Sequence, residues 1–289
     1  MATILVTHGI PAEGFSLLSG EKIVIPKPLM QFSMDELAAL IPTADAVVAC
    51  GALPGEIIRR GTKLRIIAGY GAGYDGVDVR AAAERGIPVT NLPDTVTDST
   101  AELAIGLMLA VSRRIGENSL RAREEAPENL FGMGRSMGRS LRGQTLGLLG
   151  CGRIGKRTAE IAAALGMRCI GYSRHGVNHP QVESMTLPEL LARMKQGSIL
   201  INTARGAIVD CDALADTLES GHLRGAGLDV YPDEPHIPPR LIALPQVVLT
   251  PHIGTNTQET RQRMAEGCAR QIADALAGKR PAHVVNGIE

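Results

Sequence analysis

Three segments in the last third of the chain carry residues that could protonate a carbonyl group next to a carboxylate. Arg205 lies in INTARG, Glu234 in GLDVYPDEP and His252 in TPHIG. Each segment follows or ends a predicted parallel strand, so we expect the three side chains at the carboxyl edge of one sheet, where ligands bind. An arginine can grip a carboxylate with two hydrogen bonds, and an imidazole can donate a proton. A glutamate beside the imidazole would orient the ring and favour its protonated form.

Each residue also has an ordinary explanation when taken alone. An arginine after a strand is commonly solvated or caps a helix, Glu234 lies in a proline-rich turn where a surface acid is the default, and His252 could be a loop histidine. The remaining histidines follow no pattern, and no His, Cys or Asp cluster has the spacing of a metal site. Only the combination of the three segments therefore predicts reduction of a 2-keto acid.

A glycine-rich loop, GCGRIG at 150–155, lies between the strand-like TLGLL and a helix. Gly150 would make the tight turn, Gly152 would let the backbone approach a pyrophosphate, and Gly155 would allow close helix–strand packing. The phosphates would rest on the helix N-terminus, at Arg153 and Ile154. In this context the motif predicts a dinucleotide-binding site, although a glycine-rich turn without a ligand is the alternative.

The acidic residue expected about 20 residues after this loop is missing, and Ser173-Arg174 stands there instead. A carboxylate would hold a ribose 2′-hydroxyl and repel a 2′-phosphate, whereas a hydroxyl and a guanidinium suit phosphate. The pair favours NADP(H) over NAD(H). The alternative is a solvated arginine and a site that accepts both cofactors.

Composition excludes several functional classes. The 289 residues include 30 basic and 30 acidic ones, which argues against nucleic-acid binding, and aromatic residues are only 2%. We see no signal peptide at the N-terminus and no apolar stretch long enough for a membrane span. The five cysteines are odd in number and lack a C-x-x-C pair, which predicts reduced thiols and a cytoplasmic protein.

The element pattern predicts an α/β fold with two Rossmann/flavodoxin-like doubly wound parallel-sheet domains and an interdomain cleft. Strand-like and helical stretches alternate up to residue 91 and again from Thr145. A long apolar helix begins near Asp98 or Ser99 as its cap, and a last helix covers about 257–277. We expect residues 1–93 with 261–289 to form the substrate domain and residues 94–260 to form the dinucleotide domain.

The chain resembles a known family in these motifs. Besides INTARG, GLDVYPDEP and TPHIG, the segments GYGAGYDGVDV (69–79), NLPDTVTDSTAELAIGLML (91–109) and VVN (284–286) are similar to those of the D-isomer-specific 2-hydroxyacid dehydrogenases. The resemblance covers nearly the whole chain in family order. Within the family it is closest to the glyoxylate/hydroxypyruvate reductases.

The resemblance implies further site residues. The backbone amides of Ala72 and Gly73 would hold the substrate carboxylate, and Leu53 is a candidate wall of the substrate pocket. Asp229 matches the position near the nicotinamide amide. The other implied cofactor contacts are Thr100, Thr203, Ala204 and Gly254.

The resemblance implies an enzyme that reduces glyoxylate or hydroxypyruvate. Ser173 and Arg174 predict that it prefers NADPH, and the apolar surface of the long helix predicts a homodimer built on that helix. A D-lactate or D-3-phosphoglycerate dehydrogenase would share every catalytic residue named, because these enzymes differ in the pocket wall. A non-catalytic, corepressor-like protein that binds a dinucleotide is a third alternative.

One segment departs from the family pattern. A strand of the type DVVSLHLPLTPET is expected after LPELL, but Leu191 is followed directly by Ala192-Arg193-Met194-Lys195. Without this central strand, SILINTA would slide by one strand spacing, about 4.8 Å, whereas catalytic geometry tolerates roughly 0.5 Å. We favour the explanation that the printed sequence omits a segment between about Thr186 and Met194, and a true deletion is the rival. Consecutive Cα atoms about 3.8 Å apart at this junction would exclude the omission.

Overall fold

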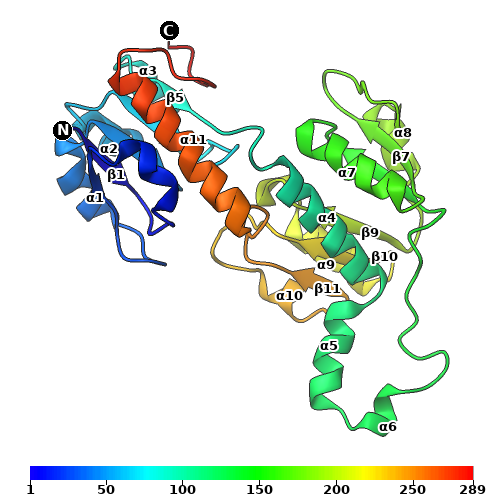
Figure 1. Cartoon of the computed structure of the whole chain (residues 1–289). Helices are drawn as coiled ribbons and strands as arrows, with labels where there is room; N and C mark the ends of the chain where they lie inside the picture. Colours follow the sequence, from blue (N-terminus) through cyan, green and yellow to red (C-terminus); the bar gives the residue numbers. More distant parts are fainter. Residues whose placement is uncertain (289) are drawn as a thin grey trace. The chain divides into compact units, whose positions relative to one another are not determined.

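The computed structural model describes residues 1–288, which form two compact units. Unit 1 comprises Met1–Val96 together with the chain from Asn256 onward, and unit 2 comprises Thr97–Thr255 (Figure 1). The boundaries expected from the sequence, residues 93 and 261, lie within a few residues of these. Each unit is an α/β structure built on parallel strands, as the pattern predicted.

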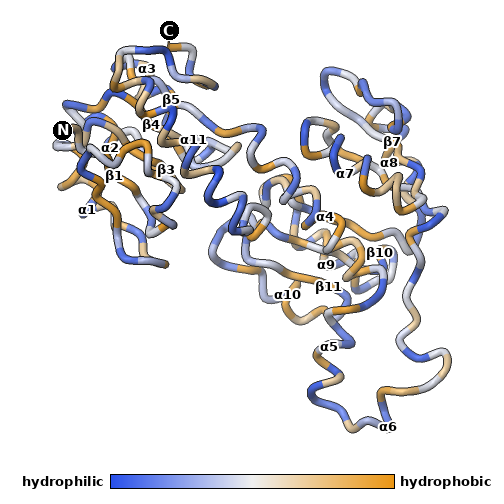
Figure 2. Tube along the Cα trace, viewed as in Figure 1, coloured by the Kyte–Doolittle hydropathy of each residue, from blue (hydrophilic) through white to orange (hydrophobic). Residues whose placement is uncertain are grey.

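Unit 1 contains one five-stranded parallel sheet in the order β2-β1-β3-β4-β5, which is the flavodoxin-like order. Its central strands carry almost only buried aliphatic side chains, and Figure 2 shows the hydrophobic colour on them. Strands with helices on both faces read as continuous apolar runs for this reason. The strands are β1 (Thr3–Val6), β2 (Lys22–Val24), β3 (Ala46–Ala49), β4 (Ile66–Gly69) and β5 (Val89–Thr90).

Short helices connect these strands, and the last helix of the chain belongs to the same unit. One side of α11 is apolar: Met264, Cys268 and Ile272 are fully buried, whereas Leu276 is only partly buried. The helices are η1 (Glu13–Leu18), α1 (Met34–Leu40), η2 (Ile41–Thr43), α2 (Gly55–Arg60), α3 (Val79–Ala83) and α11 (Gln258–Leu276).

Unit 2 is organised around the long helix α4 (Thr97–Ser112), which is buried along most of its length. Because the helix already begins at Thr97, Asp98 and Ser99 lie in its first turn and are not its caps. The rest of the unit comprises α5 (Ile115–Glu124), α6 (Pro127–Leu130), β6 (Thr145–Leu149), α7 (Arg153–Ala164), β7 (Arg168–Tyr172), β8 (Val182–Ser184), α8 (Leu187–Ala192), β9 (Ser198–Asn202), η3 (Gly206–Ile208), α9 (Cys211–Glu219), β10 (Leu223–Leu228), α10 (Pro239–Ile242) and β11 (Val247–Leu249).

The strands of unit 2 form two separate three-stranded sheets, β6-β7-β8 and β11-β10-β9. All their ladders are parallel, and β8 is a strand that the sequence pattern did not predict. Within residues 1–288 no ladder joins β6 to β9. The expectation that SILINTA slides next to TLGLL is therefore wrong.

The backbone is continuous at the junction where the family strand is missing. Leu191 and Ala192 both lie in α8, and the amides of Arg193 and Met194 donate to the carbonyl oxygens of Leu190 and Leu191 at 3.1 and 3.0 Å. Within the printed sequence, α8 is followed by β9 with no strand between them.

Packing against α4 explains why β9 does not move over to β6. A Cβ atom on Gly225 would lie 2.7 Å from Val111, and one on Gly227 would lie 3.0 Å from Leu107, so α4 is seated directly on β10. Strand β9 is paired with β10, and α4 also packs against α7. The helix thus holds each sheet in place, and moving β9 would break these contacts.

No helix among residues 1–288 is long and apolar enough to cross a membrane.

Candidate active site

His252 and Glu234 form the centre of the candidate active site. The Nδ1 atom of His252 lies 2.7 Å from Oε2 of Glu234, and the two side chains are 53% and 35% exposed. His252 follows β11 and Glu234 follows β10, so both lie beyond the carboxyl ends of neighbouring parallel strands. The pairing through Nδ1 leaves Nε2 as the ring nitrogen that can meet a substrate.

Arg205 follows β9, the third strand of the same sheet. Its guanidinium donates to the carbonyl oxygen of Ala204 at 2.6 Å, and its charge helps to lower the pKa of Glu234. The structure therefore brings together the three residues on which the sequence analysis opened. Their order along the sheet edge follows the strand order β9-β10-β11.

The pKa of Glu234 reflects two opposing effects. Partial burial alone would raise it, but the hydrogen bonds from His252 and from the backbone amide of Tyr231 more than offset that effect. The net result is a pKa below the usual value of 4.5. Glu234 is thus a carboxylate at neutral pH and can stabilise a protonated imidazole.

Asp229 is a buried acid that shapes the His252 loop. Its carboxylate accepts hydrogen bonds from the Thr250 hydroxyl at 2.7 Å and from the amides of Ile253 and Gly254 at 2.8 and 2.9 Å. Its carbonyl oxygen accepts from the His252 amide at 2.9 Å. The resemblance implied a place near the nicotinamide for Asp229, whereas the contacts in the structure tie it to the loop that presents His252.

The Arg205 loop is held by residues that the sequence analysis missed. Asn202 accepts from the amide of Ala204 at 3.1 Å and donates to the carbonyl oxygen of Arg205 at 2.8 Å. Gly206 lies so close to the backbone of Tyr231 that a Cβ atom there would be 1.9 Å from its carbonyl carbon. The only sequence signal for these roles is their position inside the two motifs.

The glycine loop follows β6, and its residues have the conformations that its motif requires. Gly150 has a φ of +102°, and a Cβ atom on Gly155 would lie 2.4 Å from the carbonyl oxygen of Gly150. A Cβ on Gly150 or Gly152 would meet nothing within 4 Å. The loop thus offers open backbone at the N-terminus of the 12-residue helix α7, where Arg153 and Ile154 begin the first turn, and this geometry fits a bound pyrophosphate.

Ser173 and Arg174 directly follow β7, which pairs with β6. They therefore lie at the same sheet edge as the glycine loop. Arg174 is exposed and Ser173 is partly buried. These positions fit a ribose phosphate bound beside the pyrophosphate.

The remaining cofactor positions fall into two groups. Thr100 is buried in the first turn of α4, and its hydroxyl donates to the carbonyl oxygen of Gly254 at 3.4 Å. Thr203 and Ala204 lie in the Arg205 loop. All four belong to unit 2, with the glycine loop on one sheet and the catalytic candidates on the other.

The substrate-binding candidates belong to unit 1. Ala72 is partly buried and its carbonyl oxygen accepts from Asn91 at 2.7 Å, while Gly73 is exposed. Leu53 is fully buried in the hydrophobic core with Ile57 and Val77. The structure thus leaves no part of the Leu53 side chain to line a substrate pocket.

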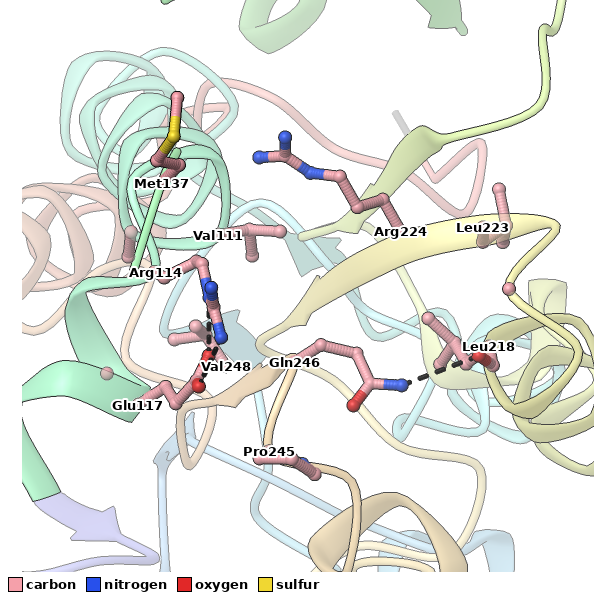
Figure 3. A pocket seen from close by; sticks show the side chains of 13 residues that line it. Val111, Arg114, Glu117, Met137, Leu218, Leu223, Arg224, Pro245, Gln246 and Val248 are labelled. Carbon is pink, nitrogen blue, oxygen red and sulfur yellow. Dashed lines mark hydrogen bonds and ion pairs between the residues drawn. The ribbon is translucent and has the colours of Figure 1, made fainter. Parts of the chain in front are cut away.

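A cavity of about 380 Å³ lies in unit 2, away from these residues (Figure 3). Its walls come from the C-terminal part of α4 and from the starts of β10 and β11, the opposite end of the strands from His252 and Glu234. Its lining includes no candidate site residue. The cavity is lined by Ala110, Val111, Arg114, Gly116, Glu117, Met137, Leu218, Gly221, Leu223, Arg224, Pro245, Gln246 and Val248.

Comparisons with known proteins agree with the geometry. The family model described as D-isomer specific 2-hydroxyacid dehydrogenase, catalytic domain, matches residues 4–286. A glyoxylate reductase of Thermococcus litoralis is 35% identical, with 98% of this chain and 96% of the relative covered. A D-3-phosphoglycerate dehydrogenase of Mycobacterium leprae is 37% identical over 87% of this chain and 53% of its own length. The crystal structure of an NADPH-dependent glyoxylate/hydroxypyruvate reductase from Sinorhizobium meliloti has a TM-score of 0.84 and 29% identity, covering 99% of this chain and 98% of that one.

The alignment with the Thermococcus relative spans 325 residues, which is more than the 289 residues of this chain. The relative thus contains residues that have no counterpart here. This difference agrees with the strand that is absent after α8.

Proposed function

Because the chain belongs to the D-isomer specific 2-hydroxyacid dehydrogenase family, we propose that it reduces small 2-keto acids of the glyoxylate and hydroxypyruvate type to D-2-hydroxy acids. The observation that carries this proposal is the 2.7 Å contact between His252 and Glu234, with Arg205 on the next strand of the same sheet. Two relatives with related activities support it, since both a solved structure and a curated protein are glyoxylate reductases by name.

The chain's own residues would handle the substrate and the proton. Arg205 holds the carboxylate of the keto acid and polarises the neighbouring carbonyl. His252 gives the proton on Nε2 to the carbonyl oxygen, while the Glu234 carboxylate stabilises the charged ring until the proton leaves. A bound nicotinamide supplies the hydride to the carbonyl carbon.

We infer a preference for NADP(H) from Ser173 and Arg174. Gly150 and Gly152 would hold the pyrophosphate at the first turn of α7, and the Arg174 guanidinium, at the end of the neighbouring strand β7, would bind the 2′-phosphate. The solved relative from Sinorhizobium meliloti is NADPH-dependent by its title, which supports the same choice.

We also propose that the protein is a homodimer, but through a different element from the long apolar helix. Most apolar side chains of helix α4 are already buried inside unit 2. Residues 115–138, which we name the arm, comprise α5, α6 and the following segment and expose large apolar side chains: Ile115, Leu120, Phe131, Met133 and Met137. Figure 1 shows the arm extending from the rest of unit 2. Several large apolar side chains exposed on one segment favour association with a second copy of the chain.

We place the protein in the cytoplasm on the state of its thiols. All five cysteines are unpaired within the described chain, and burial raises the pKa of Cys50 to about 12. A thiol of that kind stays protonated and structural.

The test is the loss of NADPH absorbance with glyoxylate, hydroxypyruvate, pyruvate and 3-phosphohydroxypyruvate, repeated with NADH and with His252→Gln as the inactive control. We expect turnover of glyoxylate and hydroxypyruvate with NADPH. A preference for pyruvate or for the phosphorylated acid would assign the protein to the lactate or phosphoglycerate class. Binding of NADPH without any turnover would favour the corepressor-like alternative.

A further inference from the structure

Tyr231 is a buried residue that contacts the loops of all three candidate catalytic residues. It lies shortly after the end of β10 and is only 5% exposed. Its ring packs in a hydrophobic cluster with Leu214, Leu228 and Leu241. Because closely packed side chains have few alternative positions, the hydroxyl at one end of the ring and the backbone at the other are held in place.

The hydroxyl of Tyr231 holds the segment that precedes His252. It lies 3.0 Å from the carbonyl oxygen of Thr250 and 3.1 Å from that of Leu228. The Leu228 oxygen also accepts from the Thr250 amide at 2.9 Å, so it keeps a partner without the tyrosine. Among residues 1–288, the other donor to the Thr250 oxygen is the His252 amide at 3.1 Å, which lies closer to Asp229, at 2.9 Å. The tyrosine hydroxyl therefore fixes the peptide group that leads to His252.

The backbone of Tyr231 holds the other two candidates. Its amide donates to Oε1 of Glu234 at 3.0 Å, while Oε2 of the same carboxylate lies 2.7 Å from Nδ1 of His252. Its carbonyl group lies against Gly206, the neighbour of Arg205, where a Cβ atom would be 2.1 Å from the Tyr231 carbonyl oxygen. One residue thus holds the Glu234 carboxylate by its amide and the His252 loop by its hydroxyl.

The Tyr231 hydroxyl keeps its proton over the pH range of an enzyme assay. Burial raises its pKa to about 12, and the negative charges of Asp229 and Glu234 act in the same direction. Cys211 is a further titratable group close to it. Changes of activity near neutral pH therefore do not come from ionisation of this tyrosine.

We propose that Tyr231 is a positioning residue for the reduction, whose hydroxyl and amide hold His252 and Glu234 in the geometry that proton transfer requires. The inference rests on the proposed function, since it concerns the same pair of residues. Tyr231 acts through the placement of the imidazole and does not touch the reacting atoms. Because catalytic geometry tolerates roughly 0.5 Å, a loop released at Thr250 slows proton transfer without changing how the substrate carboxylate is bound.

Tyr231→Phe removes the hydroxyl and keeps the ring, so the hydrophobic cluster stays filled. We expect kcat for glyoxylate with NADPH to fall about fivefold, the effect of one net hydrogen bond, while both KM values change by less than about twofold. The charged groups that face Glu234 are His252 and Arg205. A looser contact between Glu234 and His252 stabilises the protonated imidazole less, so on the alkaline side activity should decline at a lower pH. Steady-state pH profiles measure both effects.

Thr217→Val is the matched control within the same unit. The Thr217 hydroxyl on α9 donates to the carbonyl oxygen of Leu214 at 2.8 Å, and Leu214 belongs to the same hydrophobic cluster as Tyr231. This variant loses a similar hydrogen bond away from the His252 loop and should keep both kcat and the pH profile. An equal loss of kcat in the two variants would mean that only general stability is affected, and the proposal would be wrong.

A double-mutant cycle with Glu234→Gln separates positioning from general stability. Two residues that act through one contact have effects that do not add. In the Glu234→Gln background, Tyr231→Phe should lower kcat by less than about twofold, because the contact that it supports has already lost its charge. Additive effects in the double variant would contradict the positioning role.

Hydrogen–deuterium exchange tests the same role without turnover. The amides of His252, Ile253 and Gly254 donate to Asp229. They should exchange about fivefold faster in Tyr231→Phe than in the unmodified chain, whereas the amides of β10 should not change. Equal exchange of the loop amides in both chains would overturn the inference. A chain that reduces no keto acid but shows the faster exchange would instead contradict the proposed function and leave the role of Tyr231 in holding the loop.

Discussion

His252 is held in a backbone conformation that non-glycine residues rarely adopt. Its φ is +53°, in the left-handed region, where side chains other than glycine are strained. The buried Asp229 offsets this strain, because its carboxylate accepts from three groups of the 250–254 loop. Strained residues of this kind concentrate at functional sites. At the scale of single residues, the geometry of the imidazole thus depends on an acid that does not touch it.

Replacing Glu234 with Gln should lower kcat/KM for keto-acid reduction by about tenfold to a hundredfold, because a neutral amide no longer stabilises the protonated imidazole. On the alkaline side, activity should decline at a lower pH than in the unmodified enzyme. Steady-state pH profiles with glyoxylate check both effects. Glu219→Gln is the control and should leave the profile unchanged, because Glu219 is an exposed acid on α9 that accepts a hydrogen bond from Arg240.

Because the pKa of Glu234 is lowered, the difference in stability between the unmodified protein and this variant should depend on pH. A carboxyl group whose pKa is depressed on folding stabilises the native state above its unfolded pKa and loses that effect as pH falls through its folded pKa. Urea unfolding should therefore show the unmodified protein as the more stable at pH 7. The difference should disappear well below pH 4.5, and its persistence there would contradict the assignment.

Arg174→Asp tests the cofactor choice at a single side chain. A carboxylate repels the 2′-phosphate and can hold a ribose hydroxyl, so KM for NADPH should rise at least tenfold while KM for NADH falls. Arg193→Asp, with the same charge change after α8, controls for net charge. An unchanged ratio of the two KM values would mean that Arg174 does not contact the phosphate.

At the scale of elements, α4 is the support on which both sheets of unit 2 rest. Glycines at 225 and 227 allow its side chains to approach the backbone of β10, and its apolar residues also contact the cluster around β6 and α7. The helix thereby positions the loops that follow β9, β10 and β11. This explains why the candidate catalytic residues stay together although a central strand is missing.

Gly227→Ala should destabilise the protein by about 1–3 kcal/mol, because its Cβ would lie 2.9 Å from Ile201 and 3.0 Å from Leu107 in a packed interior. Gly106→Ala is the matched control within α4. A Cβ there meets nothing within 4 Å, so we expect a gain of about 0.5–1 kcal/mol from helix propensity. Chemical denaturation measures both, and equal effects would refute the packing argument.

At the scale of the whole molecule, the arm is the element through which we propose that two copies associate. Phe131 is 80% exposed and Met133 is fully exposed, so the single chain leaves apolar surface for a second copy. The cavity at the base of the arm is lined by Arg114 and Arg224 as well as by apolar residues (Figure 3). Burial, together with Arg139 and Arg114, lowers the pKa of Arg224, which marks a concentration of positive charge.

The double variant Phe131→Ser, Met133→Ser should convert the dimer into a monomer, because it removes two large apolar contacts from the arm. Sedimentation equilibrium of the unmodified and variant chains measures this change. Leu17→Ser with Leu29→Ser, two exposed leucines of unit 1, is the control and should remain dimeric. A variant that stays dimeric would place the interface elsewhere.

The local pattern of the sequence was sufficient to predict most elements of the fold. Within residues 1–288, apolar runs marked every strand except β8, because parallel strands covered on both faces must be continuously apolar. Only β8, three residues long with two exposed, carried too little signal. Motif spacing likewise identified Arg205, Glu234 and His252, since each is attached to the end of a strand.

Tertiary structure decided what local patterns cannot express. Leu53 was a candidate pocket wall by its loop, but its side chain is buried in the core. The absence of a strand after α8 was visible in the sequence, but whether β9 would move toward β6 was not. That outcome depends on contacts between α4 and β10, which join residues more than 100 positions apart, and no local sequence pattern records such contacts.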